Sequence, residues 1–354
     1  MKILAIDIGA GTQDILVFND EDTIENSIKL VLPSPPVIIS KIIKKATTDL
    51  YFDGDIMGGG KIKNYIDNHI KKGFKVAMEK QAAKTIKDDL KVAEAIGVEL
   101  VDEGSYSNSK FSNYSKITLK DIDINELSST IAKYDLDFSF DHIAVAVQDH
   151  GFSNKMGDRD FRFEKIREKL SYPLKVEDFG FINAPDYFTR MKAVERSLSG
   201  LNPVLTDSKF AAICGACQDP NVAKLNSYVV MDIGNGHTMA ASIENGHIHG
   251  VFEHHTSMLN SQKIESLVSK LVKATITHLE VHEDHGHGAH VVNPISKLEK
   301  VVVTGPKRSI IEKTNLDYYN AAPAGDVMMT GPVGLIETVK YLKNQNKFNN
   351  FINK

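Results

Sequence analysis

A short sequence pattern occurs twice in this chain, once at the N-terminus and again about 225 residues later. Residues 3–17 read ILAIDIGAGTQDILV, and residues 228–243 read YVVMDIGNGHTMAASI. Each copy contains an apolar strand, the motif Asp-Ile-Gly-X-Gly, a polar turn residue and a second apolar strand. The pattern predicts a β-hairpin, and two such hairpins indicate two related half-domains that face one ligand.

The glycine-rich turns indicate a polyanionic ligand. A turn without side chains exposes its backbone N–H groups, and these can surround the oxygens of a phosphate. Asp7 and Asp232 end the first strand of each hairpin. Because a carboxylate repels phosphate, we expect these two side chains to hold a hydrated Mg²⁺ ion instead.

The composition excludes several classes of protein. A chain of 354 residues can bury a large core and is long enough for two domains. Its hydrophobic fraction of 42% and charged fraction of 25% are typical of a soluble globular protein. The net charge of −4 gives no sign of a nucleic-acid-binding surface, and no apolar run reaches the roughly 18 residues that cross a bilayer.

The two cysteines and the early first strand indicate the compartment. Two cysteines do not make a disulfide framework. The first strand is expected over residues 2–8, which leaves no room for a signal peptide before it. We therefore expect a cytoplasmic protein whose partners include neither a membrane nor a nucleic acid.

The apolar pattern predicts a mixed α/β chain with two lobes. We expect an N-terminal lobe over residues 1–150, a charged and aromatic linking insertion over 151–206, and a C-terminal lobe over 207–354. Buried strands are expected at 142–147 and 301–304. The expected helices cover residues 61–72, 80–96, 161–170, 185–197, 209–217, 259–279 and 331–342, and a histidine-rich loop is expected at 281–293.

The order of these motifs resembles that of the actin, sugar-kinase and heat-shock-chaperone ATPase superfamily. That fold has two similar ribonuclease H-like lobes, each with a five-stranded sheet, which close over ATP in a nucleotide cleft. The first phosphate loop of the superfamily matches DIGAGTQD at 7–14, the second matches DIGNGHT at 232–238, and the adenosine motif matches VVVTGP at 301–306. The two connecting segments match residues 144–149 and 331–335.

The resemblance implies ATP and Mg²⁺ as cofactors. It also implies that Asp7 and Asp232 contact the Mg²⁺ ion through water molecules. Contacts to the nucleotide are implied for Gly9, Gly11, Thr12, Gln13, Gly234, Asn235, Gly236, His237, Thr238, Gly305 and Pro306. The adenosine motif usually has two adjacent glycines, whereas here Pro306 follows Gly305. Because proline lacks an N–H donor and fixes φ, the resemblance implies phosphate binding more directly than adenine recognition.

Phosphoryl transfer needs a group that orients the attacking water or hydroxyl. Gln148 and Asp149 directly follow the buried strand at 142–147, so they are expected at the mouth of the cleft. Asp149 suits a base for a substrate hydroxyl, and Gln148 suits the positioning of water. The alternative is that Asp149 caps the following turn. Asp14, which ends the first phosphate loop, is a further carboxylate that could take this role.

Ten of the 13 histidines lie between His237 and His290. His247 and His249 share one face of a strand and could bind one metal ion, with further ligands from residues 282–290. The alternative is a solvated polar loop. His237 lies inside the second phosphate loop, where it could touch a phosphate if protonated or only pack if neutral.

Cys214 and Cys217 form a CxxC pair in a segment of small residues. In the resembled fold this segment is a helix packed under the phosphate loop, so core packing is the favoured interpretation. The alternative is an iron–sulfur cluster that bridges the two subunits of a homodimer. ATP-driven activases of acyl-CoA dehydratases in this superfamily use two cysteines per subunit in that way, although without the CxxC spacing.

Within the superfamily the chain resembles a mostly archaeal family labelled pyruvate formate-lyase activating enzyme. That label implies a radical enzyme with a three-cysteine motif. The sequence contains only two cysteines and no Cys-X₃-Cys-X₂-Cys, so the residues contradict the label.

Three functions are compatible with these motifs. The first is an Mg-ATP-dependent phosphotransferase (a kinase) that acts on a small metabolite, or a slow ATPase. The second is an ATP-gated activator that changes lobe closure and delivers an electron or a conformational signal to a partner. The third is a nucleotide-binding regulatory protein without turnover. The fold hosts all three, and the sequence does not identify the substrate.

Overall fold

The computed structural model describes residues 1–134 and 138–345, and the end of the predicted C-terminal lobe lies outside this part. The first sheet contains, in spatial order, β3 (Ile28–Pro33), β2 (Thr12–Asn19), β1 (Lys2–Ile8), β8 (His142–Val147) and β9 (Val204–Thr206). β2 is antiparallel to both β1 and β3, whereas β8 is parallel to β1 and to β9. The first predicted hairpin therefore lies at the centre of a five-stranded sheet.

The second sheet contains, in spatial order, β13 (Gly288–Val291), β12 (His247–His255), β11 (His237–Glu244), β10 (Ser227–Ile233), β14 (Val301–Thr304) and β15 (Tyr318–Asn320). The second predicted hairpin is β10 and β11. If the additional edge strand β13 is set aside, the order and the strand directions match those of the first sheet. This duplicated topology confirms the predicted two-lobed, ribonuclease H-like α/β fold.

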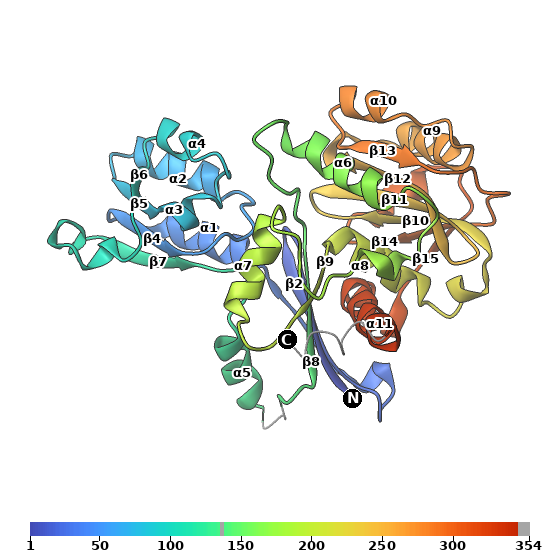
Figure 1. Cartoon of the computed structure of the whole chain (residues 1–354), viewed down its shortest axis with the longest axis horizontal. Helices are drawn as coiled ribbons and strands as arrows, with labels where there is room; N and C mark the ends of the chain where they lie inside the picture. The colour runs from blue at the N-terminus through green and yellow to red at the C-terminus, as the bar shows by residue number, and fades with distance from the viewer. Residues whose placement is uncertain (135–137, 346–354) are drawn as a thin grey trace.

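A third sheet, not expected from the sequence, is inserted between β3 and β8. It contains, in spatial order, β6 (Glu99–Val101), β5 (Val76–Glu79), β4 (Leu50–Gly54) and β7 (Ser115–Leu119), all parallel. Its helices are α1 (Pro35–Lys45), α2 (Ile62–Lys71), α3 (Lys80–Ala83) and α4 (Lys91–Ala95). This sheet has a core of its own and extends to one side of the molecule, at the left of Figure 1.

Two helices cross between the first and second sheets, α8 (Ser208–Cys217) and α11 (Thr330–Asn344). α11 packs on one face of the first sheet and α8 on one face of the second. Alternate residues of the buried strands point to opposite faces, so both faces of each sheet carry apolar side chains.

The outer faces of the two sheets are covered by shorter helices. On the first sheet these are α5 (Ile124–Ala132) and α7 (Thr189–Ser197), and on the second they are α9 (Ser261–Val272) and α10 (His278–Glu283). α6 (Asp158–Lys169) packs with α8 against the inner face of the second sheet. Within the described residues no helix is both long and apolar enough to span a membrane.

Several expected segments differ from the observed elements. The helix expected over 80–96 is observed as two short helices, α3 and α4, and the Asp89 side chain accepts a hydrogen bond from the N–H of Lys91 at 3.1 Å where α4 begins. The loop expected at 281–293 contains the end of α10 and all of β13. The linking insertion expected at 151–206 supplies α6, α7 and β9, the fifth strand of the first sheet.

Candidate functional site

A cleft of about 470 Å³ lies where the three sheets meet. Both glycine-rich turns contribute to its wall. The third sheet contributes residues 56–60 and 84–88, and the segment after β8 contributes residues 148–151. Further parts of the wall come from the first turns of α8 and α11, from residues 304–306, and from one or two residues each of α1, α6, α7 and the segment before α11.

The two glycine-rich turns have the same backbone hydrogen bond. The N–H of Gly9 donates to the carbonyl of Thr12 at 2.9 Å, and the N–H of Gly234 donates to the carbonyl of His237 at 3.0 Å. The sequence repeat is therefore also a conformational repeat.

The tips of the two turns approach each other across the cleft. A Cβ atom on Gly11 would lie 2.7 Å from Nδ2 of Asn235, so a side chain at this position would require Asn235 to move. Two polar, side-chain-poor turns that meet in one cleft suit a ligand with several negative charges.

Asp7 and Asp14 lie opposite each other in the β1–β2 ladder, and both are buried. Burial raises the pKa of Asp7 to about 7 and that of Asp14 to about 8, and the charge of Asp7 raises the pKa of Asp14 further. Within the described residues Oδ1 of each aspartate has no hydrogen-bond partner. Two buried carboxyl oxygens without partners fit a divalent cation that prefers oxygen ligands, as Mg²⁺ does.

Asp232, the equivalent residue of the second turn, has a partner that the sequence reasoning missed. Lys209 Nζ lies 2.5 Å from Asp232 Oδ2 and donates to the carbonyl of His237 at 2.7 Å. Lys209 is in the first turn of α8, whose N-terminus is capped by the Asp207 side chain. The Asp-Ser-Lys run before a segment of small residues was the available signal, since it marks a helix start beside the turn.

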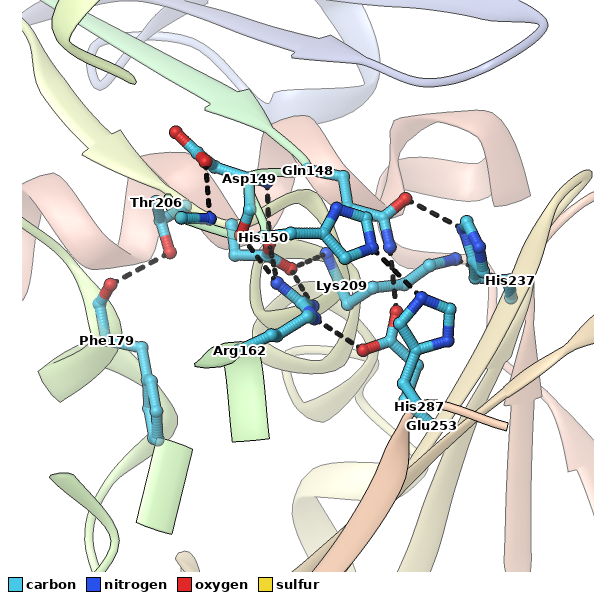
Figure 2. A network of polar contacts seen from close by, with 12 residues as sticks. Gln148, Asp149, His150, Arg162, Phe179, Thr206, Lys209, His237, Glu253 and His287 are labelled. Atoms are coloured by element: carbon cyan, nitrogen blue, oxygen red, sulfur yellow. Dashed lines mark hydrogen bonds and ion pairs between the residues drawn. The ribbon is translucent and has the colours of Figure 1, made fainter. Parts of the chain in front are cut away.

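Gln148 is held between two side chains of the second lobe (Figure 2). Its Nε2 donates to Glu253 Oε1 at 2.7 Å, and its Oε1 lies 2.9 Å from Nδ1 of His237. The amide orientation is therefore fixed by contacts on both of its ends. Gln148 also lines the cleft, as expected from its position after β8.

Asp149 lines the cleft, but its carboxylate is already engaged by the backbone. Oδ1 accepts a hydrogen bond from the N–H of Gly151 at 2.8 Å, and Oδ2 accepts from the N–H groups of Arg190 and Met191, both at 2.9 Å. The contact with Gly151 is the one expected if Asp149 caps the turn that follows it. The same carboxylate also caps the first turn of α7. Burial raises the pKa of Asp149 to about 6, although these hydrogen bonds oppose the shift.

Three residues predicted to contact the nucleotide do not line the cleft: Gly11, Gln13 and Thr238. The Gln13 side chain donates to the carbonyl of Pro33 at 3.2 Å. Thr238 is buried, and its hydroxyl lies 3.0 Å from that of Thr256. Both side chains point away from the cleft because neighbouring residues of a strand alternate between its faces. The other predicted contact residues line the cleft.

The predicted adenosine motif packs against the second turn. Gly305 has φ of +91°, and a Cβ atom there would lie 2.5 Å from the carbonyl oxygen of Ile233 and 2.6 Å from Asp232 Oδ1. Glycine is therefore required by both the backbone conformation and the close approach. Pro306 follows it in the wall of the cleft.

Both cysteines are free thiols in α8. Cys214 is 1% exposed and belongs to the core between α8 and the second sheet. Burial raises the pKa of Cys214 far above its ordinary value and that of Cys217 to about 12. These environments favour core packing over a subunit-bridging iron–sulfur cluster, which needs accessible thiolates.

The predicted histidine pair of β12 does not lie near the cleft wall. His247 Nδ1 contacts the carbonyl of Asn245 at 2.9 Å, and neither His247 nor His249 belongs to a group with metal-binding geometry in the described part of the chain. His237 instead lies against His150 and His287 (Figure 2). Burial lowers the pKa of His237 to about 4, so its ring is neutral at physiological pH.

Residues 57–310 match the model of the family described as "Putative pyruvate format-lyase activating enzyme (DUF1786)". The chain belongs to this family. The membership predicted from the sequence is thereby confirmed. The activity named in the family's description conflicts with the residues, because the two cysteines are packed in α8 and cannot supply a three-cysteine cluster.

Several solved structures also match over nearly the whole chain. The activator of 2-hydroxyisocaproyl-CoA dehydratase from Clostridium difficile, with bound ADPNP, is 9% identical with a TM-score of 0.38, and the match covers 98% of this chain and 97% of that one. The polyphosphate/ATP-glucomannokinase from Arthrobacter sp. strain KM is 10% identical with a TM-score of 0.38, over 96% and 99% of the chains.

A Bacteroides thetaiotaomicron protein of unknown function with an actin-like ATPase fold is 7% identical with a TM-score of 0.37, over 94% of this chain and 95% of that one. Likeness at these scores carries no argument about the ligand or the activity of this chain. No curated protein matches the sequence.

Proposed function

We propose that this protein binds Mg-ATP in the cleft and is a phosphotransferase for a small metabolite or a slow ATPase. The observation that carries the proposal is the pair of glycine-rich turns with the same backbone hydrogen bond in one cleft, together with buried carboxyl oxygens that have no partner among the described residues. Phosphate oxygens would accept hydrogen bonds from the backbone N–H groups of the turns. The carboxylates of Asp7 and Asp232 would hold the Mg²⁺ ion that accompanies the phosphates.

The residues of the cleft have distinct roles in this proposal. Asp7 and Asp232 would hold Mg²⁺ through water molecules, and Lys209 holds Asp232 in place through their contact of 2.5 Å. Mg²⁺, when bound, neutralises the charge that develops on the transferred phosphoryl group. Gly305 and Pro306 face the nucleoside end of the ligand.

We assign the orientation of the attacking water or hydroxyl to Gln148. Its amide is held by two hydrogen bonds, so it can present a fixed dipole without reorganisation. Asp149 is the second candidate. To act as a base it would have to release at least one of three backbone N–H groups, and this cost favours a positioning role for Asp149 at the start of α7.

A nucleotide-binding protein without turnover is the second candidate function. The engagement of Asp149 by backbone donors favours it, because this carboxylate is then not free to accept a substrate proton. The electron-transferring activator is less favoured, since the thiol of Cys214 is buried in the core.

The first test is thermal melting with and without Mg-ATP. Binding at 100 times the dissociation constant stabilises a protein by about 2.7 kcal/mol, so wild type should melt at a clearly higher temperature with ligand. The double variant Asp7→Ala plus Asp232→Ala should lose this shift. Asp53→Ala is the matched control, because Asp53 also lies at the end of a strand but does not line the cleft.

The outcome separates the candidate functions. If millimolar Mg-ATP leaves the melting temperature of wild type unchanged, the nucleotide proposal is wrong. If the shift occurs, release of inorganic phosphate, alone and with candidate metabolites, distinguishes an enzyme from a binding protein. Gln148→Ala should then reduce turnover without abolishing the thermal shift.

A further inference from the structure

Three imidazoles from distant parts of the sequence meet at the wall of the cleft. His150 follows β8, His237 begins β11, and His287 precedes β13. One ring nitrogen of each lies within 4.8 Å of a ring nitrogen of the other two. We call these three residues the histidine cluster, and Figure 2 shows their rings turned toward one another.

The spacing within the histidine cluster is close to that of metal ligands. Nε2 of His150 lies 2.9 Å from Nε2 of His287, and the ring centroids of His237 and His287 are 4.6 Å apart. With Zn–N bonds of about 2.0–2.1 Å and tetrahedral angles, two donor nitrogens stand roughly 3.3 Å apart. Small side-chain adjustments would therefore bring the three rings around one ion.

Hydrogen bonding alone does not satisfy these rings. His287 is 2% exposed, and its Nδ1 has no hydrogen-bond partner among the described residues. Burial lowers the pKa of His287 to about 3 and that of His150 well below its ordinary value. A buried imidazole nitrogen without a partner can act as a ligand to a metal ion.

The residues behind the histidine cluster have the arrangement of an outer shell around a metal site. Gln148 Oε1 faces Nδ1 of His237, which leaves Nε2 of that ring for a ligand bond. Gln148 in turn donates to Glu253, a fully buried carboxylate. Burial raises the pKa of Glu253, but the charge of Arg162 outweighs it and holds that pKa well below the ordinary value.

Arg162 forms ion pairs with both Asp207 and Glu253, at 2.7 and 2.6 Å. These ion pairs fix the Glu253 carboxylate, which in turn holds Gln148 behind His237.

We propose that His150, His237 and His287 bind a divalent first-row transition-metal ion of the Zn²⁺ type. Three imidazoles without an oxygen donor suit zinc, copper, iron or nickel rather than magnesium, so this site is separate from the carboxylates proposed for Mg²⁺, Asp7 and Asp232. His150 and His237 line the cleft. The fourth coordination position is therefore open to water or to an oxygen atom of a cleft ligand, as in zinc sites with three protein ligands.

The proposal does not depend on nucleotide binding, and the metal alone can test it. Tag-free, metal-stripped protein would be titrated with Co²⁺, whose visible absorption reports its coordination, and the bound Co²⁺ would then be displaced with Zn²⁺. We expect one equivalent of Co²⁺ with the intense absorption of a four-coordinate site. His287→Ala and, separately, His150→Ala should lose this signal while circular dichroism shows that they remain folded.

Two further variants make the result specific. His247→Ala plus His249→Ala removes two histidines of β12 outside the histidine cluster and should bind Co²⁺ as wild type does. Gln148→Ala should keep the stoichiometry and lose about 10- to 100-fold in affinity, the usual effect of removing an outer-shell partner. The proposal is overturned if folded wild type takes up no stoichiometric Co²⁺, or if both cluster variants bind it as tightly as wild type.

Discussion

At the scale of single residues, Asp7 and Asp14 make the stability of the metal-free protein depend on pH. Their pKa values in the folded protein are about 7 and about 8, against 3.8 for an ordinary aspartate. The folded state therefore binds more protons than the unfolded chain between these values. The resulting stabilisation is complete below about pH 4 and is lost as the pH rises through about 7 to 8.

We expect the melting temperature of the protein in EDTA to fall between pH 6 and pH 9. Asp14→Asn should flatten this dependence, because the amide has no proton to lose. The measurement is scanning calorimetry over a pH series. Asp53→Asn provides the control and should follow wild type; equal slopes for wild type and Asp14→Asn would contradict the assignment.

At the scale of elements, the crossing of α8 and α11 determines how closely the two lobes approach. A Cβ atom on Gly215 would lie 1.8 Å from the carbonyl oxygen of Thr330 and 2.9 Å from the N of Gly334. Both neighbours are backbone atoms, which cannot turn aside. We expect Gly215→Ala to lower the free energy of unfolding in urea by roughly 1–3 kcal/mol, the usual range for overpacking.

The same variant should weaken the effect of Mg-ATP on melting, because α11 begins at the cleft. A Cβ atom on Gly331 would lie 2.0 Å from Asp7 Oδ2, so the helix start and the first turn are in close contact. Gly157→Ala is the matched control, since its Cβ would meet only Asp160 Oδ2 at an ordinary 3.6 Å. Equal urea midpoints for the two variants would show that the crossing tolerates a methyl group.

Local patterns account for what could be predicted about these elements. Both hairpins follow from the glycine turns between apolar strands, and the helix over 209–217 follows from a run of small residues. The third sheet was missed because β6 has only three residues, too few to show a period. A short strand is recognisable at residues 76–78, within β5, but one short strand does not define a sheet. α1 was missed because Pro35 and Pro36 suggest a break, although proline is favoured at the first position of a helix.

The parts of the site that were missed depend on contacts between distant residues. The carboxylate of Asp149 accepts hydrogen bonds from two N–H groups at the start of α7, which are 41 and 42 residues away in the sequence. His150 contacts His287, which lies 137 residues further along the sequence. No sequence period connects such pairs, because the packing of the two lobes brings them together. The sequence therefore predicted the turns of the cleft, but not the histidine cluster or the Lys209–Asp232 pair.

At the scale of the whole molecule, Arg190 connects the third sheet to the first. Its guanidinium donates to both oxygens of Asp121, at 2.7 and 2.9 Å, and to the carbonyl of Gln148 at 3.0 Å. Asp121 also accepts a hydrogen bond from the N–H of Gly58 at 3.0 Å. The glycine run at 58–60 is therefore held against the end of β8, where it forms one wall of the cleft.

This connection predicts how a ligand in the cleft acts on the third sheet. Hydrogen exchange should show that Mg-ATP protects the amides of residues 56–60 as well as both glycine-rich turns. In Arg190→Ala the turns should keep their protection, whereas residues 56–60 should lose it, because the loop is no longer tied to β8. Arg196→Ala is the matched control: Arg196 pairs with Asp55 outside the cleft, so its loss should leave the pattern unchanged. If protection in wild type is confined to the two turns, the third sheet does not enclose the nucleotide, and its wall of the cleft is left for a second substrate.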